Sequence, residues 1–200
     1  EPVWSVYPAT QINDLAWGDV DNDGYLDILV SCNSDFINIL LNDGDGTFTF
    51  SSDVSDADVI LTDPYGAGVA DVNGDGDLDI SLTEGYNIAG RHPVARNNLS
   101  EEIRKNSLQV IVSNENGILN KAGAEVRVYD DGGSLLGLRL VATGDGYNSQ
   151  SNQPVHFALP SGENIDVEVT FLINQGRKTQ RVEDIKPSKY IGKTLIIKHE

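Results

Sequence analysis

A nine-residue acidic segment occurs twice in this 200-residue chain and restricts its fold more than any other feature. It reads Asp-Val-Asp-Asn-Asp-Gly-Tyr-Leu-Asp at 19–27 and Asp-Val-Asn-Gly-Asp-Gly-Asp-Leu-Asp at 71–79, which is 52 positions later. Each copy carries oxygen-bearing side chains at its positions 1, 3, 5 and 9 and a glycine at position 6. So many neighbouring carboxylates repel one another unless a cation lies between them. The repeat therefore predicts two cation-binding loops, which we call loop 1 (19–27) and loop 2 (71–79).

Calcium is the cation that suits both loops. Ca²⁺ takes roughly six to eight hard oxygen ligands at about 2.3–2.6 Å and tolerates irregular geometry, whereas Mg²⁺ demands a stricter octahedron. We predict two Ca²⁺ sites, each built from the four side chains and the backbone carbonyl of position 7. The predicted ligands are Asp19, Asp21, Asp23, Tyr25 and Asp27 in loop 1, and Asp71, Asn73, Asp75, Asp77 and Asp79 in loop 2. We expect positive φ at Gly24 and Gly76, where the chain must turn sharply.

Two other interpretations of the loops are weaker. An EF-hand needs a Glu at position 12 and flanking helices, but position 12 is Val30 in one copy and Leu82 in the other. The residues that follow each loop also read as strands. Asp, Asn and Gly form ordinary turns without metal, but a turn needs two or three such residues and not the same nine-residue pattern twice.

The acidic side chains are concentrated in the first half of the chain. Residues 1–100 hold 18 acidic and 2 basic side chains and residues 101–200 hold 13 and 12, for a formal net charge of −17. The asymmetry predicts a domain boundary near residue 100 and a first half that repels itself without cations. It argues against nucleic acid and anionic membranes as partners, and no apolar run predicts membrane insertion. Cys32 is the only cysteine, so we expect a buried thiol and no intrachain disulfide.

The remaining sequence predicts an all-β chain. Short strands at 27–31, 36–42 and 47–50 suggest that residues 1–100 form two β-propeller-blade-like calcium repeats. A single helical turn capped by Ser100 is expected at the junction. Residues 106–200 predict an antiparallel β-sandwich, because apolar and polar residues alternate along its segments. Its seven predicted strands are 108–112, 124–129, 136–142, 155–159, 165–173, 178–185 and 193–198.

Two repeats cannot close a propeller, which needs about four to eight blades. An uncovered strand edge also invites aggregation. We therefore expect both that the repeats end a longer chain and that the second domain covers their open edge.

Both loops resemble the calcium loops of FG-GAP, or VCBS, repeats, which are the units of integrin-type β-propellers. The similarity includes the flanking residues 16–18 and 68–70 and the hairpin at 40–48. The resemblance implies that the aspartates and the carbonyl named above hold calcium. Asn73 stands where the family has an aspartate, which lowers the charge of loop 2 by one and should weaken it slightly.

The second half resembles the ASPIC/UnbV domain that follows VCBS repeats in cartilage acidic protein-like proteins. The matching residues lie at 122–126, 144–150 and 155–159. The chain departs from the family at 171–176, where a Trp-Pro-Ser-Gly-like turn is usual. The two resemblances imply extracellular placement, calcium binding and interaction with other molecules, and they imply no reaction.

We therefore predict a calcium-binding extracellular binding or adhesion module, part of a secreted or cell-surface protein, whose partner is an extracellular protein or glycan. One alternative is an accessory carbohydrate-binding region of a secreted polysaccharide-active enzyme. Another is a purely structural propeller cap. An exposed aromatic patch would favour sugar binding, and a buried set would favour the structural role. The aromatic residues concerned are Trp4, Trp17, Tyr65, Tyr86 and Tyr147. We expect Trp17 to be buried beside loop 1.

His156 is the strongest catalytic candidate, because Asp145, Tyr147 and Ser149 lie close to it in sequence. Ser149 is not on a nucleophile elbow, and a histidine on an apolar strand more often makes a structural hydrogen bond. The three histidines share no zinc-ligand spacing. We predict that the chain is not an enzyme and that calcium is its only cofactor.

Overall fold

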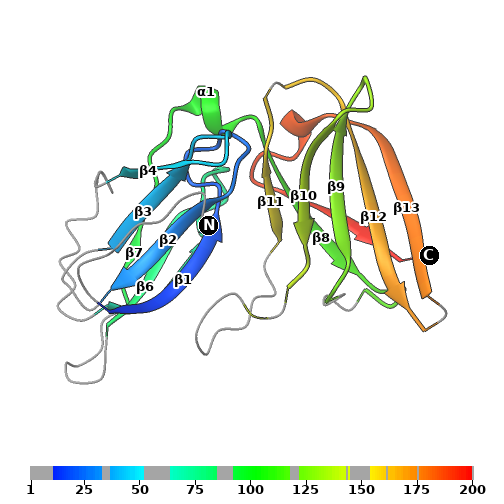
Figure 1. Ribbon diagram of the computed structural model, residues 1–200. Coiled ribbons are helices and arrows are strands. Elements are labelled where there is room, and N and C mark those ends of the chain that lie inside the picture. The colour runs from blue at the N-terminus through cyan, green and yellow to red at the C-terminus, as the bar shows by residue number, and fades with distance from the viewer. Residues whose placement is uncertain are drawn as a thin grey trace.

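The computed structural model describes residues 11–32, 37–51, 64–84, 92–117, 122–142, 144, 154–160, 162–174 and 176–199. Over these residues the chain forms fourteen strands, one short α-helix and one 3-10 helix (Figure 1). This confirms the predicted all-β class. The repeats lie beside the C-terminal strands, and α1 lies at the junction between them.

Two antiparallel sheets form the N-terminal part. The first has the order β1-β2-β3-β4, with β1 (Ile12–Gly18), β2 (Asp27–Cys32), β3 (Ile37–Asn42) and β4 (Phe48–Ser51). The second has the order β5-β6-β7, with β5 (Pro64–Ala70), β6 (Asp79–Glu84) and β7 (Val94–Ala95). Loop 1 joins β1 to β2, and loop 2 joins β5 to β6. Each loop therefore occupies the same place in its sheet.

The sequence repeat is also a repeat of strand register. Gly18 pairs with Asp27 in the first sheet, and Ala70 pairs with Asp79 in the second. The pairing shifts between Ile12 and Asp14 in β1 and between Pro64 and Gly66 in β5, again 52 positions apart. The two units therefore share this register shift as well as the acidic loop.

The two sheets pack against each other through small and aliphatic side chains. Their shared core consists of Ala16, Val20, Leu29, Ile39, Ala67, Ile80, Leu82 and Ala95. Asp14 reinforces this contact, because its Oδ2 accepts a hydrogen bond of 3.2 Å from the backbone N–H of Ala67. Cys32 lies in a separate buried cluster with Val30 and Leu40, which confirms the prediction of a buried thiol.

The C-terminal part is a sandwich of two sheets, and all seven predicted strands are present. One sheet has the order β10-β9-β12-β13, and the other has the order β11-β8-β14. The strands are β8 (Ser107–Ser113), β9 (Glu125–Asp130), β10 (Leu135–Leu140), β11 (Val155–Ala158), β12 (Ile165–Ile173), β13 (Gly176–Ile185) and β14 (Thr194–Lys198). Alternate residues of these strands fill the core, as Val167, Val169 and Phe171 do in β12.

One strand pair differs from the predicted antiparallel arrangement. β14 pairs with β8 in the parallel direction. The 3-10 helix η1 (Pro187–Lys189) stands between β13 and β14, which belong to different sheets. Parallel strands cannot be joined by a tight hairpin, and β9 to β13 lie between β8 and β14 in the chain. Alternation of apolar residues identifies a buried face, but it does not determine strand direction.

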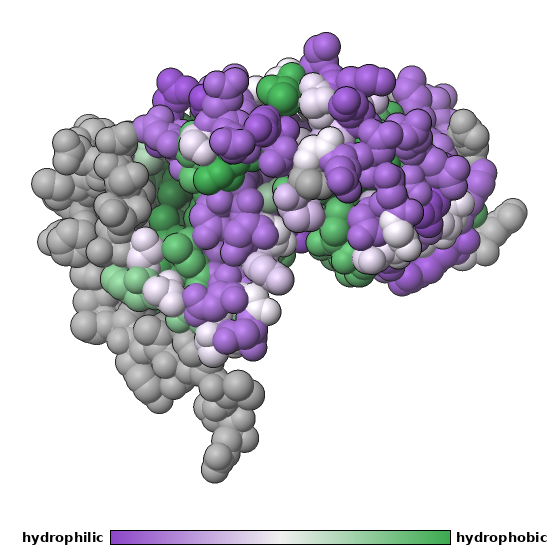
Figure 2. Space-filling view, turned by 90° about the horizontal axis from the view of Figure 1, so that it is seen from above, coloured by the Kyte–Doolittle hydropathy of each residue, from purple (hydrophilic) through white to green (hydrophobic). Residues whose placement is uncertain are grey.

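The junction contains the predicted helical turn, α1 (Glu101–Arg104). The expected side-chain cap is wrong, because the Ser100 hydroxyl makes no cap hydrogen bond. Its backbone carbonyl instead accepts the N–H groups of Ile103 and Arg104. Seen from above, the molecule is hollowed between the repeats and the sandwich, and hydrophilic residues cover much of the described surface (Figure 2).

Candidate metal-binding loops

Loop 1 brings three of its five predicted ligands together. Carboxylate oxygens of Asp19, Asp21 and Asp27 all lie within 4.8 Å of one another. Asp19 and Asp27 are each only 1% exposed, and Asp21 is half-buried. A single hard cation can contact oxygens at this spacing. Among the described residues, no other trio of carboxylate, imidazole or thiol groups is this close.

Backbone N–H groups hold the first half of loop 1 in shape. Asp19 accepts hydrogen bonds from the N–H of Asp23 at 3.1 Å and of Gly24 at 3.0 Å. Asp23 is exposed and outside the trio, and it accepts the N–H of Tyr25 at 2.8 Å. Gly24 has φ +100°, which confirms the prediction of a left-handed turn there. Asn22 also has positive φ, at 57°.

The last ligand position of loop 1 is fixed from β3. Asp27 accepts hydrogen bonds from the backbone N–H of Val20 at 2.8 Å and of Asn42 at 2.9 Å. The Asn42 side chain in turn donates to the carbonyl of Leu26 at 3.0 Å. Asn42 therefore holds both the carboxylate and the backbone at the end of the loop.

The electrostatics of loop 1 favour a bound cation. Burial and the neighbouring Asp23 and Asp27 carboxylates raise the pKa of Asp19 to about 7, which outweighs the lowering effect of Arg139. Burial also raises the pKa of Asp27 to about 6, against its hydrogen bonds from Asn42 and Val20, and burial and Asp23 raise the pKa of Asp21. A divalent ion favours the charged carboxylates and lowers these pKa values. Oxygen donors, close spacing and raised pKa values together fit a hard divalent cation.

Loop 2 repeats the backbone pattern of loop 1. Asp71 accepts hydrogen bonds from the N–H of Gly74 at 2.7 Å, of Asp75 at 3.1 Å and of Gly76 at 2.9 Å. Gly76 has φ +100°, which again confirms the prediction. Asp75 accepts the N–H of Asp77 at 3.2 Å. The two loops therefore share a fold at corresponding positions.

Asn97 holds the end of loop 2 in the same way as Asn42 holds the end of loop 1. Asp79 accepts the backbone N–H of Val72 at 3.0 Å and that of Asn97 at 2.8 Å, and the Asn97 side chain donates to the carbonyl of Leu78 at 3.3 Å. Sequence reasoning missed both asparagines. The available signal was an asparagine 15 or 18 residues after the last aspartate of each loop.

The side-chain contacts of loop 2 differ from those of loop 1. Asp75 Oδ2 lies 3.2 Å from Arg104 Nη1, 3.6 Å from Arg96 Nη2 and 2.9 Å from Asn73 Nδ2. Asp71 Oδ2 accepts a hydrogen bond of 2.6 Å from Gln109 Nε2 in β8. No three carboxylates of loop 2 converge as those of loop 1 do. The predicted ligands are thus present, but several are already paired with the chain's own donors.

Asp77 has a second role that the sequence did not predict. Its side chain is fully buried and accepts the backbone N–H of Leu99 at 3.1 Å. Burial and the Asp75 charge raise its pKa to about 6, although the Leu99 hydrogen bond and Arg104 lower it. Asp77 therefore supports the junction through its side chain, whereas the sequence analysis predicted only a role for its backbone carbonyl, as a calcium ligand.

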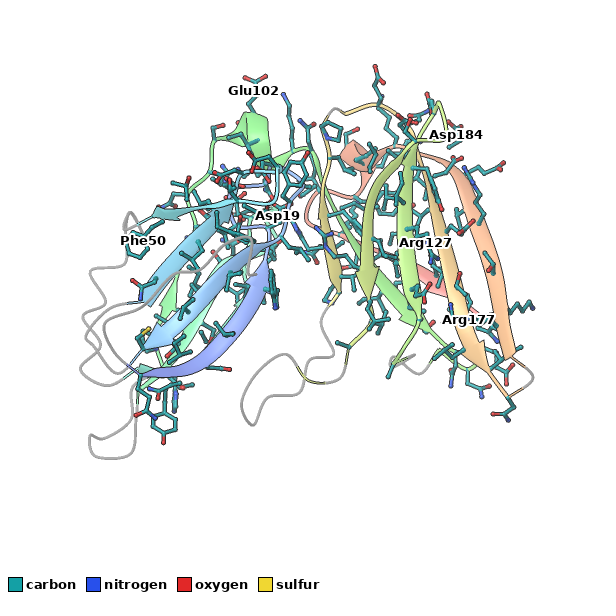
Figure 3. All side chains as sticks on the ribbon, in the orientation of Figure 1. Asp19, Phe50, Glu102, Arg127, Arg177 and Asp184 are labelled. Atoms are coloured by element: carbon teal, nitrogen blue, oxygen red, sulfur yellow. The ribbon has the colours of Figure 1, made fainter. Side chains whose placement is uncertain are left out.

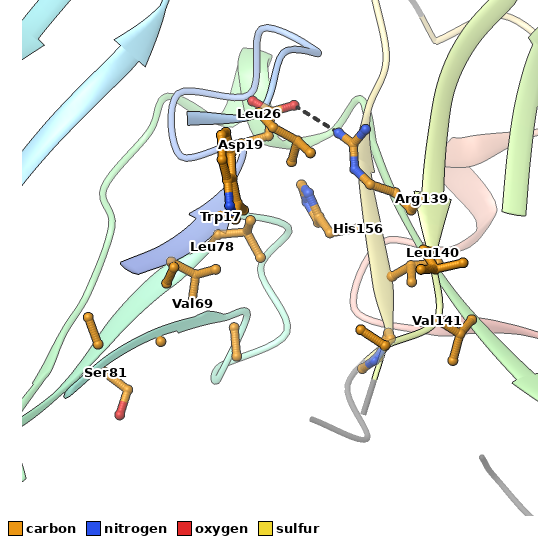
Figure 4. A pocket seen from close by; sticks show the side chains of 18 of the residues that line it. Trp17, Asp19, Leu26, Val69, Leu78, Ser81, Arg139, Leu140, Val141 and His156 are labelled. Carbon is orange, nitrogen blue, oxygen red and sulfur yellow. Dashed lines mark ion pairs between the residues drawn. The ribbon is translucent and has the colours of Figure 1, made fainter. Parts of the chain in front are cut away.

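A cavity of about 690 Å³ lies between the repeats and the sandwich. Figure 4 shows Trp17, Val69 and Leu78 on the repeat side and Arg139, Leu140 and Val141 on the sandwich side. Asp19 and Arg139 approach to 4.0 Å at its end.

The prediction that Trp17 is buried is wrong, because the residue is 56% exposed. Successive residues of a strand point to opposite faces. Ala16 occupies the face that packs on the second sheet, so Trp17 lies on the other face, where it lines the cavity.

His156 makes a structural hydrogen bond across the junction. It is 8% exposed, and its Nε2 lies 3.1 Å from the carbonyl oxygen of Gly76 in loop 2. Because a carbonyl only accepts, Nε2 must carry the proton. Burial lowers the pKa of His156 to about 4, so the ring is neutral near pH 7. Its sequence neighbours Asp145, Tyr147 and Ser149 lie outside the described residues.

Comparison with protein families identifies both halves of the chain. Residues 19–81 match the FG-GAP-like repeat model, and residues 112–199 match the ASPIC and UnbV model. The chain therefore contains an FG-GAP-like repeat region followed by an ASPIC/UnbV domain, which confirms these two predicted regions. The likeness to cartilage acidic protein-like proteins stays a prediction. FG-GAP-like repeats are typical of extracellular or cell-surface proteins, so this is an extracellular type of repeat module.

Comparison with curated proteins gave no match. In the described part of the chain, none of the helices has the length and apolar character that crossing a membrane requires.

Proposed function

We propose that the chain is a calcium-binding module of a secreted or cell-surface protein, and that it serves binding or adhesion and not catalysis. The approach of Asp19, Asp21 and Asp27 to within 4.8 Å supports this most directly. In this proposal Asp23 and the carbonyl of Tyr25 complete the ligand set with water. The ion would neutralise carboxylates that otherwise repel one another inside a small β-unit.

The role of the ion in this proposal is structural. Loop 1 joins β1 to β2, and Asp27 is bonded to Asn42 at the end of β3. An ion bound at loop 1 would therefore stabilise three strands of the first sheet at one point. In a small domain a structural metal can supply stability that the core alone does not.

The proposed partner is an extracellular protein or glycan. One observation favours a glycan, and with it the alternative of an accessory carbohydrate-binding region. Trp17 is exposed and lines the cavity beside Leu138 and Leu140. Concave sites with apolar walls and few polar groups are typical of small-ligand binding. Trp4, Tyr86 and Tyr147, which belonged to the predicted aromatic set, lie outside the described residues.

Isothermal titration calorimetry on the chelator-stripped full chain tests the calcium assignment. We expect Ca²⁺ to bind more tightly than Mg²⁺, and Asp21→Asn to weaken the tight site at least tenfold. Asp131→Asn is the matched control, because Asp131 is an exposed acid in the turn after β9 and outside both loops. Calcium binding that survives Asp21→Asn unchanged, or no binding by the wild-type chain, would contradict the proposal.

A further inference from the structure

Loop 2 lies where the repeats meet the C-terminal half of the chain. Gly76 accepts a hydrogen bond from His156 in β11 through its carbonyl. A Cβ atom at Gly76 would lie 2.6 Å from the Arg104 carbonyl oxygen and 2.6 Å from Ser107 Oγ. Such distances are too short for any side chain, so glycine is required there for packing as well as for its φ angle. Loop 2 is therefore in tight contact with α1, β8 and β11.

The Asp71 carboxylate of loop 2 is saturated by donors. It accepts three backbone N–H groups and the side-chain amide of Gln109, which makes four hydrogen bonds. An ionised carboxylate offers about four lone-pair positions. Asp19, at the same position of loop 1, accepts two backbone N–H groups and has Arg139 only at 4.0 Å. Asp19 thus keeps acceptor capacity that Asp71 has already used.

Two arginines also offset part of the negative charge of loop 2. Arg104 and Arg96 both approach Asp75 Oδ2, at 3.2 and 3.6 Å. Among the described residues, no arginine or lysine pairs with Asp21 or Asp23 in loop 1. Two guanidinium groups therefore lie against loop 2, whereas loop 1 has only Arg139, 4.0 Å from Asp19. As arranged here, the donor set of loop 2 does not fit a tightly held ion.

We propose that loop 2 is a joint that binds the C-terminal half of the chain, with Gln109, Arg104 and Arg96 in the place of a tightly bound cation. The two copies of the motif then have different tasks. Loop 1 is the ion site, and loop 2 connects the FG-GAP-like repeats to the ASPIC/UnbV domain. A cation entering loop 2 must displace Arg104 or Gln109, so any binding there is weak. The joint does not depend on whether loop 1 holds calcium.

Calcium titration of the full chain tests the first half of this inference. We expect one tight site in the wild-type chain, weakened at least tenfold by Asp21→Asn. The double variant Arg96→Ala/Arg104→Ala should bind calcium at loop 2 at least about tenfold more tightly, which corresponds to removing about 1.4 kcal/mol of repulsion. Arg177→Ala is the control, since Arg177 pairs with Glu125 and lies far from Asp19 (Figure 3). Two tight wild-type sites, or no gain of calcium affinity at loop 2 in the double variant, would overturn the inference.

Thermal unfolding in excess chelator tests the second half without calcium. Gln109→Ala and Arg104→Ala should each lower the Tm relative to wild type, and Arg177→Ala should lower it less. If Gln109→Ala does not fold, Gln109→Asn provides a milder change at the same position. Unchanged Tm values for Gln109→Ala and Arg104→Ala in chelator would overturn the proposed joint. This measurement remains decisive if the wild-type chain binds no calcium, a result that would contradict the proposed function alone.

Discussion

Asn97 donates a side-chain hydrogen bond of 2.6 Å to the carbonyl of Val20, 77 positions earlier in the chain. The same amide lies 3.3 Å from the Leu78 carbonyl, and the backbone N–H of Asn97 bonds Asp79. One junction residue therefore ties loop 1 to loop 2. The loops are also joined by Asn22, whose amide donates to the Gly76 carbonyl at 3.2 Å.

We predict that Asn97→Ala is more destabilising than Asn42→Ala. The change at Asn97 removes donors to carbonyls of both loops. The Asn42 side chain donates only to Leu26 in its own loop and accepts the exposed N–H of Gly44. Leaving a buried polar group unsatisfied costs about 1–3 kcal/mol. Urea unfolding monitored by circular dichroism should give this order. Asn116→Ala, in an exposed turn, is the control, and equal losses at all three positions would argue against a link between the loops.

Calcium should stabilise the chain through loop 1. An ion that binds only the folded state adds about 2.7 kcal/mol when its free concentration is 100 times Kd. We therefore expect a higher Tm in calcium than in chelator, and a much smaller difference in Asp21→Asn. Differential scanning calorimetry with and without calcium measures both. Identical wild-type curves in the two buffers would exclude a structural ion.

The stabilisation by calcium should increase with pH between about 5 and 7.5. Asp19, with a pKa of about 7, and Asp27, with a pKa of about 6, are raised from the ordinary 3.8 that applies in the unfolded chain. Without metal, the folded state holds more protons than the unfolded chain in this range. These two carboxyl groups therefore destabilise the folded state increasingly as pH rises. Calcium requires the charged forms, and therefore competes with protons.

His156 acts in the opposite direction. Its pKa is lowered from 6.5 to about 4 in the folded state. It therefore favours the folded state increasingly as pH rises from about 4 to about 6.5. The difference between melting curves in calcium and in chelator separates the two effects, because His156 contributes to both curves. A difference that is constant from pH 5 to 7.5 would contradict ion binding by the loop 1 carboxylates.

The sequence predicted features that depend on local rules. The loop glycines have positive φ because a tight acidic loop permits little else, and all seven sandwich strands follow from alternation of apolar residues. Ser100 shows the limit of such rules. A helical turn follows it, but its backbone carbonyl and not its hydroxyl accepts N–H groups of the turn, those of Ile103 and Arg104.

Features that depend on distant contacts were not predicted. The exposure of Trp17 depends on which face of β1 meets the second sheet. The pairing of Gln109 with Asp71 depends on how the sandwich docks, and the parallel entry of β14 depends on a crossover between sheets. A motif defines which atoms a loop offers, but docking decides whether they remain available. That is why two similar sequences give loops with different chemistry.

Trp17→Ala should abolish glycan binding at the cavity without a large change in stability. The side chain is 56% exposed, so its removal opens no buried space, but it removes the main aromatic surface that lines the cavity. Phe50→Ala is the matched control, because Phe50 is 54% exposed on β4 and lies away from the cavity (Figure 3). A glycan array probed with the wild-type chain and both variants, with and without calcium, measures the effect.

Glycan binding that Trp17→Ala leaves intact would place the sugar site elsewhere. If the wild-type chain binds no glycan, the exposed tryptophan favours an extracellular protein as the partner, which a pull-down with the same two variants can test.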